Sequence, residues 1–228
     1  MTSGAPGIEV YWGSGSPFAW RVLLTAALKQ IPYTSHQLQF SQKDHKAPAY
    51  LALNDRGEVP VLRDGDVTLT ESIAIMTYLD ARFPDPPLFG ADAVATAEIW
   101  RWVFATVYHI EPNANRIIGP AFARAIDDHA DDMRAAAGDL HAEFARFEAV
   151  LGERPWLAGE TVSAADIVAH TYGAFFLRIA ARDTLRHLDL GFDTLGDRYP
   201  NVDAWRLRTT ELPGYDAAYP PHWRDGSA

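Results

Sequence analysis

Apolar residues recur with two different periods in the first part of the chain. Residues 8–12 (IEVYW) form a short apolar, β-prone run, and residues 17–30 then repeat apolar side chains at the i, i+4 spacing of a helix. Residues 33–40 return to alternation. This order predicts a β-α-β unit whose two strands are parallel and joined by a right-handed crossover.

A second group of elements follows the polar, irregular stretch 41–58. Asp64-Gly65 lies between two β-rich runs, which is a strong signal for a hairpin. Residues 70–83 then carry a helical apolar face made of Ile73, Met76, Leu79 and Phe83. We therefore expect an α/β fold with a β-α-β unit, then β-β-α, on one mixed sheet.

The proline-rich stretch 84–90 (PDPPLFG) marks a change of pattern. Beyond it the periodicity is helical, over residues 92–110, 113–126, 129–151, 163–182 and 201–210. We expect an α/β domain at 1–84, a linker at 85–90 and an all-α domain at 91–228. The end of the chain, 211–228, fits either a segment folded back on the body or a free tail.

Composition narrows the class of protein. The 228 residues are 48% apolar, which suits a folded chain, and the net charge of −10 argues against nucleic acid or anionic membranes as partners. The absence of cysteine excludes disulfides, thiol nucleophiles and cysteine-based zinc sites, and no histidine spacing suggests a metal. No run approaches the ~18 apolar residues of a membrane helix, so we expect a cytoplasmic protein.

Two stretches place polar groups where a helix or strand begins. Ser16 before Pro17 has the residue types of a helix N-cap and first helical position, and a hydroxyl there could also hold an anion such as a thiolate. Val59-Pro60 fits an edge strand or turn. A cis bond there would instead turn the Val59 backbone outward, where an extended peptide could pair with it.

Two predicted helix N-termini can also be interpreted as structural or as functional. Glu71 and Ser72 fit an ordinary first turn, or a site where the hydroxyl and free N–H groups bind a carboxylate while Glu71 receives an ammonium. Ser163 and Asp166 have the spacing of a capping box. We expect the second pair to nucleate a buried helix and to serve folding rather than chemistry.

Taken in order, four motifs resemble the glutathione S-transferase superfamily over nearly the whole chain: SPFAWRV, LNDRGEVPVL, TESIAIMTYL and WLAGETVSAADI. The resemblance implies a thioredoxin-like domain followed by a helical domain, usually in a homodimer. It implies glutathione as co-substrate, no metal, and a small hydrophobic electrophile as second substrate. Any thiol must then come from this tripeptide, because the chain has none of its own.

The resemblance also implies roles for individual residues. Ser16 falls where serine-type members keep the residue that stabilises the glutathione thiolate. Val59 and the following Pro60 fall where the family pairs a backbone with the cysteinyl unit, before a cis proline. Glu71 and Ser72 fall at the pair that binds the γ-glutamyl end.

Further positions complete the expected site. His45 matches a ligand of the glycine carboxylate in theta- and delta-like members, although an exposed histidine without a ligand fits equally, and Phe18 is expected to line the site. Glu58 is left out, because an acidic side chain would repel that carboxylate. Family position suggests a second-substrate wall made of Trp100, Phe104, Tyr108 and Arg116.

Several alternatives stay open at this level. Ser14 and Tyr11 are rivals of Ser16 as the thiolate-stabilising residue. A glutathione-dependent isomerase would use the same thiolate, and a disulfide reductase would need glutathione to supply both thiols. A non-catalytic transferase-like interaction protein is the alternative outside the enzymes.

Overall fold

The computed structural model describes residues 7–224 and divides them into two compact units. The first unit contains residues 7–87 together with 212–224, and the second contains residues 88–211. Residues 212–224, which the sequence pattern assigns to the helical domain, therefore group with the α/β unit. The reason is a set of aromatic contacts with the first helix that no local pattern reveals.

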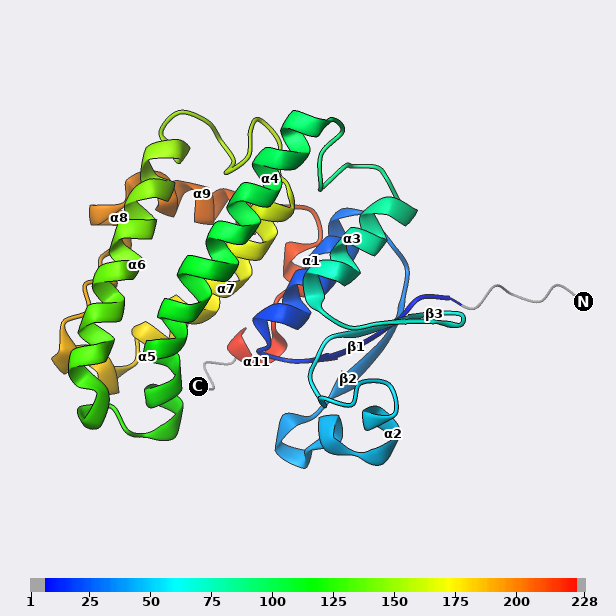
Figure 1. The fold of residues 1–228 in the computed structure, drawn as a ribbon, viewed down its shortest axis with the longest axis horizontal. Helices are drawn as coiled ribbons and strands as arrows, with labels where there is room; N and C mark the ends of the chain where they lie inside the picture. The colour runs from blue at the N-terminus through cyan, green and yellow to red at the C-terminus, as the bar shows by residue number, and fades with distance from the viewer. Residues whose placement is uncertain (1–6, 225–228) are drawn as a thin grey trace, which may run out of the picture. The chain divides into compact units, whose positions relative to one another are not determined.

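The first unit is built on one four-stranded sheet with the order β2-β1-β3-β4 (Figure 1). The strands are β1 (Glu9–Gly13), β2 (Thr34–Leu38), β3 (Val61–Asp64) and β4 (Val67–Leu69). β1 and β2 are parallel, whereas β3 pairs antiparallel with both β1 and β4. The predicted mixed sheet is confirmed, including the hairpin, in which Asp64 pairs with Val67 across a two-residue turn.

Helices of the first unit connect and cover these strands. They are α1 (Pro17–Leu28), α2 (Pro48–Leu51), α3 (Ser72–Arg82), α10 (Tyr215–Ala218) and α11 (Pro221–Arg224). Single 3-10 turns occupy Phe40–Gln42 and Asp44–Lys46 in the loop after β2. The two long helices α1 and α3 pack side by side, and α1 is buried over most of its surface.

The second unit is built from helices, with one isolated β-bridge between Trp156 and Gly159. Its helices are α4 (Ala93–Ala105), α5 (Glu111–Ala123), α6 (Ala130–Leu151), α7 (Ala164–Ala180), α8 (Leu195–Arg198) and α9 (Pro200–Thr210). A π-helical turn at Thr106–Ile110 joins α4 to α5, where two separate helices are expected from sequence. Pro112 lacks the N–H that an α-helix would use there, and the wider turn accommodates this loss.

The helix α7 forms the centre of the second unit, and Asp166 fixes its first turn. Asp166 is fully buried and accepts four hydrogen bonds, two at each carboxylate oxygen. The donors are the Leu157 N–H at 2.9 Å, the Ser163 N–H and hydroxyl at 3.0 Å each, and the Trp205 indole at 2.9 Å. The capping box is thus present, and the same carboxylate ties α7 to α9.

Replacing Asp166 should destabilise the fold strongly. We expect Asp166→Ala to lower the free energy of unfolding by about 3–5 kcal/mol, because four buried donors lose their acceptor. Asp92→Ala is the matched control, since Asp92 caps α4 at an exposed position and its loss should cost about 1 kcal/mol. Urea denaturation measures both, and equal losses for the two variants would contradict the assignment.

A second buried polar group of α7 makes stability depend on pH. Burial, with a smaller contribution from the charge of Arg206, lowers the pKa of His170 to about 3. The unfolded chain binds the proton more readily, so the stabilisation is complete above pH ~6.5 and falls by about 1.4 kcal/mol per pH unit below it. We expect His170→Gln to remove this part of the acid sensitivity between pH 7 and 5, measured by urea unfolding.

The exposed His129 gives the control for this measurement. His129→Gln should keep the pH dependence of the unsubstituted protein. If His170→Gln showed the same pH dependence of unfolding as the wild-type protein, His170 would not be held neutral by the fold.

Candidate functional site

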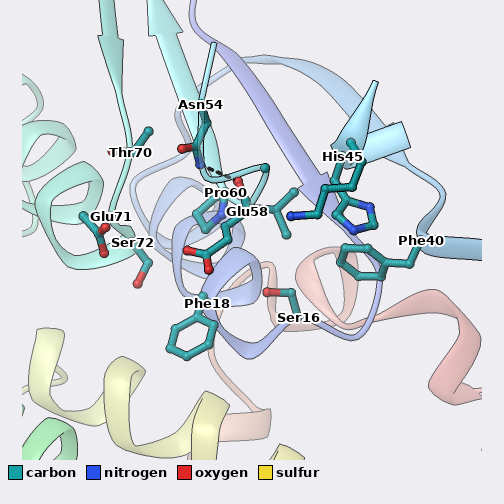
Figure 2. A pocket seen from close by; sticks show the side chains of 13 residues that line it. Ser16, Phe18, Phe40, His45, Asn54, Glu58, Pro60, Thr70, Glu71 and Ser72 are labelled. Atoms are coloured by element: carbon teal, nitrogen blue, oxygen red, sulfur yellow. Dashed lines mark hydrogen bonds between the residues drawn. The ribbon is translucent and has the colours of Figure 1, made fainter. Parts of the chain in front are cut away.

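One cavity of about 510 Å³ opens in the first unit, within the size range of small-molecule sites. Its lining comes from the start of α1, the loop after β2, the turn before β3 and the start of α3 (Figure 2). The lining residues are Ser16, Phe18, Phe40, His45, Lys46, Asn54, Gly57, Glu58, Val59, Pro60, Thr70, Glu71 and Ser72. All seven residues expected from sequence to bind glutathione or its thiol are among them.

Figure 2 shows how these groups are distributed around the cavity. Glu71 and Ser72 lie on one side, His45 and Phe40 on the opposite side, and Ser16 lies between them. A ligand that contacts both sides would therefore extend across the cavity, with the Ser16 side chain between its two ends.

Ser16 stands at the N-cap of α1 with its hydroxyl on the cavity. Its backbone is extended (φ −77°, ψ 116°), Pro17 is the first helical residue, and its Oγ accepts a hydrogen bond of 3.2 Å from the Ala19 N–H. A hydroxyl has two lone pairs and one proton. Because the cap uses a lone pair, the proton remains available to an anion placed in the cavity.

The turn before β3 brings the backbone of Val59 to the cavity. The Val59-Pro60 bond is cis, as the sharper interpretation of the sequence has it. The neighbouring Glu58 carbonyl accepts two hydrogen bonds of 2.7 Å, from the Tyr50 hydroxyl and the Asn54 amide. Burial raises the pKa of Tyr50 well above that of an ordinary phenol, so this hydroxyl stays a donor at neutral pH.

Glu71 and Ser72 open α3 at the other side of the cavity. Glu71 is the N-cap residue and has φ +66°, a conformation that residues other than glycine rarely adopt and that recurs at ligand sites. Its exposed carboxylate pairs with Arg56 at 2.9 Å. Ser72 is buried, and its Oγ lies 3.4 Å from Nη1 of the buried Arg21.

His45 and Lys46 supply nitrogen donors at the far side. The His45 ring stands edge-on to Phe40 at 5.2 Å between centroids. Its Nδ1 atom is buried and has no hydrogen-bond partner among residues 7–224. Lys46 Nζ donates to the Arg56 carbonyl at 2.9 Å, which keeps its charge near the cavity.

The structure adds lining residues that sequence reasoning does not select. Glu58 is left out of the expected site on grounds of charge, yet it lines the cavity, and its adjacency to Val59 is the signal that could have placed it there. The other additions are Phe40, Lys46, Asn54, Gly57 and Thr70. Most of these belong to the irregular stretch 41–58, where no periodicity indicates which side chains turn inward.

The two rivals of Ser16 are engaged elsewhere. The Ser14 Oγ lies 2.6 Å from Nδ1 of His222, and the Tyr11 hydroxyl donates to Glu9 Oε2 at 3.1 Å. The Tyr11 ring also stacks on His36 at 4.4 Å. Neither rival is among the described residues that line the cavity.

The residues expected to bind a second substrate belong to the helical unit. Trp100, Phe104 and Tyr108 form a ladder of aromatic rings along α4 and the π-helical turn, with centroids 5.3 and 5.5 Å apart. Phe104 is 45% exposed and Tyr108 is 65% exposed, so this ladder is available to a ligand.

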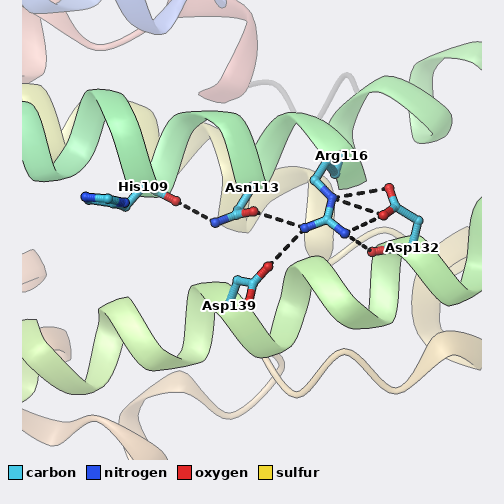
Figure 3. A network of polar contacts seen from close by, with 5 residues as sticks. All are labelled: His109, Asn113, Arg116, Asp132 and Asp139. Carbon is cyan, nitrogen blue, oxygen red and sulfur yellow. Dashed lines mark hydrogen bonds and ion pairs between the residues drawn. The ribbon is translucent and has the colours of Figure 1, made fainter.

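Arg116 is engaged in a polar network that joins α5 to α6 (Figure 3). Its Nε bonds to Asp132 at 3.1 Å, and its Nη1 atom bonds to Asp139 at 3.0 Å and to Asn113 at 3.1 Å. These carboxylates raise the pKa of Arg116 above its usual range, Asp132 most strongly. The arrangement favours a role in joining the two helices over one in binding substrate.

Residues 7–224 contain neither a candidate metal centre nor a candidate membrane span. No group of three or more histidine and carboxylate side chains there is placed to hold a metal ion. No helix of that range is long and apolar enough to cross a membrane.

Comparison with known families assigns both units to one superfamily. The profile of the family "Glutathione S-transferase, N-terminal domain" matches residues 15–82, and that of "Glutathione S-transferase, C-terminal domain" matches residues 112–213. The chain belongs to the glutathione S-transferase superfamily. Its first unit is the thioredoxin-like domain of that superfamily, and its second is the helical domain.

Individual relatives cover most of the chain. Glutathione S-transferase A of Pleuronectes platessa is 26% identical over 96% of this chain and 94% of the relative. Glutathione S-transferase F9 of Arabidopsis thaliana is 31% identical over 64% of this chain and 71% of the relative. The crystal structure of a glutathione S-transferase from the Antarctic clam Laternula elliptica is 30% identical and superposes with a TM-score of 0.83 over 96% of this chain and 94% of that one.

Proposed function

We propose that the chain is a glutathione transferase that binds glutathione in the cavity of the first unit and holds its sulfur as a thiolate at Ser16. The observation that carries this proposal is the Ser16 hydroxyl itself. Its oxygen is tied to the Ala19 N–H while its proton is left for a ligand of the cavity. The names of the relatives support the same activity.

The polar groups of the cavity match glutathione from one end to the other. The N-terminus of α3 with Ser72 suits the γ-glutamyl carboxylate, and Glu71 suits its ammonium group. The Val59 backbone suits the cysteinyl amide, as an added strand would pair with it. His45 and Lys46, on the far side, suit the glycine carboxylate.

The energy required for thiolate formation is within reach of this arrangement. A free thiol of this type has a pKa of ~8.5, and lowering it by about two units requires about 2.7 kcal/mol of preference for the anion. A hydrogen bond to a charged acceptor contributes roughly 1.5–3 kcal/mol, and a helix N-terminus about 0.3–1 kcal/mol. Ser16 can therefore act as a donor without serving as a base.

We further propose that a small hydrophobic electrophile binds to the helical unit against Trp100, Phe104 and Tyr108. The exposed rings of Phe104 and Tyr108, in line with Trp100, suit an apolar ligand. Arg116 is left out of this wall, since its guanidinium already bonds to two carboxylates and an amide.

The remaining expectations are also proposals. We expect a cytoplasmic homodimer that serves detoxification, and sedimentation equilibrium would test the oligomeric state. An isomerase or a disulfide reductase would retain glutathione and form the thiolate without conjugating a chlorinated dinitrobenzene. A non-catalytic interaction protein would show neither thiolate absorbance nor turnover, and these two assays together separate the classes.

Removing the Ser16 hydroxyl should abolish most of the thiol activation. We expect Ser16→Ala to raise the pKa of bound glutathione by about 1–2 units and to lower kcat at neutral pH about 10–100-fold, because one donor to the anion is lost. The dissociation constant for glutathione should change little. Ultraviolet absorbance of the thiolate against pH and conjugation kinetics give the two readouts.

Ser41→Ala is the matched control, because Ser41 is exposed and lies outside the cavity. It should keep the wild-type thiol pKa and turnover. Unchanged turnover in Ser16→Ala would reject Ser16 as the thiolate-stabilising residue.

Glu58 should weaken glutathione binding, because its carboxylate and the ligand both carry negative charge. We expect Glu58→Gln to lower the KM for glutathione about 2–5-fold at low salt, with kcat unchanged. The effect is modest because solvent partly screens a charge at the surface. The difference in KM between Glu58→Gln and the wild-type protein should shrink as ionic strength rises. A KM that does not respond to the substitution at low salt would show that the Glu58 carboxylate does not face the bound ligand.

A further inference from the structure

The last described residues of the chain are anchored on α1 by an aromatic cluster. Trp20 is 1% exposed and meets three rings edge-on. Its centroid lies 5.6 Å from Tyr215, 5.4 Å from Tyr219 and 5.6 Å from Trp223. Edge-to-face pairs of rings at this spacing contribute stability beyond that of the area they bury. The segment 212–224 therefore has a fixed position on α1.

The backbone of this segment also approaches α1 closely. Gly214 has φ +75°, and a Cβ atom placed there would lie 2.7 Å from Cβ of Ala27. Only glycine permits both this conformation and this approach. The chain is therefore guided onto α1 at Gly214 and held there by the rings that follow.

The segment ends against the loop that precedes α1. Nδ1 of His222 lies 2.6 Å from the Ser14 hydroxyl, a hydrogen bond between residues 208 positions apart. A Cβ atom on Gly15, which has φ +89°, would lie 2.7 Å from Cε1 of His222. The imidazole thus packs directly on the backbone of the loop as well as bonding to its side chain.

This loop carries Ser16 into the cavity. The Ser16 N–H donates to the Gly13 carbonyl at 3.2 Å, so Ser14 and Gly15 are the central residues of a tight turn. One end of the turn is fixed by the pairing of Gly13 with β2, and the other by the N-cap of α1. His222 contacts the two central residues between these fixed ends.

We propose that His222 is a positioning residue for thiolate formation: by holding Ser14 and Gly15 it sets the position of the Ser16 hydroxyl. This inference rests on the proposed function of Ser16. The segment 212–224 is then an element of the glutathione site, although the helical unit separates it in sequence from the rest of that site. His222 acts through the loop and is not among the residues that line the cavity.

The test compares variants on both sides of the hydrogen bond in the full chain. We expect His222→Ala and Ser14→Ala each to raise the pKa of bound glutathione by about 0.5–1 unit, which lowers the thiolate fraction at neutral pH about 3–10-fold. The KM for glutathione should stay within about twofold, because the binding groups at the two ends of the cavity are untouched. His222→Asn can replace the Nδ1 hydrogen bond and should restore most of the wild-type pKa.

Arg224→Ala is the control within the same segment, since Arg224 contacts Asp216 and Tyr219 and not the loop. It should leave the thiol pKa unchanged. Wild-type pKa and kcat in both His222→Ala and Ser14→Ala would overturn the proposal. If His222→Ala fails to fold, Ser14→Ala decides alone, because it leaves the aromatic anchor intact.

The two proposals fail in different ways. A wild-type protein that binds glutathione without thiolate absorbance would reject the role of Ser16 itself. An active wild-type protein whose loop variants behave normally would reject only the role of His222.

Discussion

The proposed chemistry of the cavity depends on the hydrogen bond that Ser16 Oγ accepts from the Ala19 N–H. This bond caps α1 and occupies a lone pair of the oxygen, so the hydroxyl proton is left for a ligand. It also fixes the side chain at the electropositive end of the helix, where an anion is stabilised. The structural cap and the proposed anion-binding donor are therefore the same hydroxyl group, and neither role excludes the other.

The rest of the first unit presents complementary groups around that hydroxyl. The α3 N-terminus with Ser72 lies on one side, and His45 and Lys46 lie on the other, so both ends of the cavity carry hydrogen-bond donors. Between them, Tyr50 and Asn54 hold the backbone that leads into Val59. In the proposed function, glutathione binding and thiol activation come from separate groups, which is why the two can be measured apart.

The helical unit shows how polar residues can serve structure alone. Asp166 has four donors and no access to solvent, and His170 is held neutral by burial. Arg116 illustrates the same principle at the surface, where it joins α5 to α6 through Asp132 and Asp139. Family position by itself suggests a substrate contact for Arg116, whereas its partners in the fold indicate a structural one.

The sequence by itself determined the β-α-β and β-β-α order, the helical second unit, and seven lining residues from Ser16 to Ser72. The elements follow from periodicity, caps and turn residues, which act between neighbours in the chain, whereas the seven lining residues follow from the family resemblance that four ordered motifs carry. Only the tertiary structure decided that Lys46, Asn54 and Glu58 line the cavity, because their loop has no repeating pattern. It also decided that His222 meets Ser14, since a contact across 208 positions leaves no local signal in either segment.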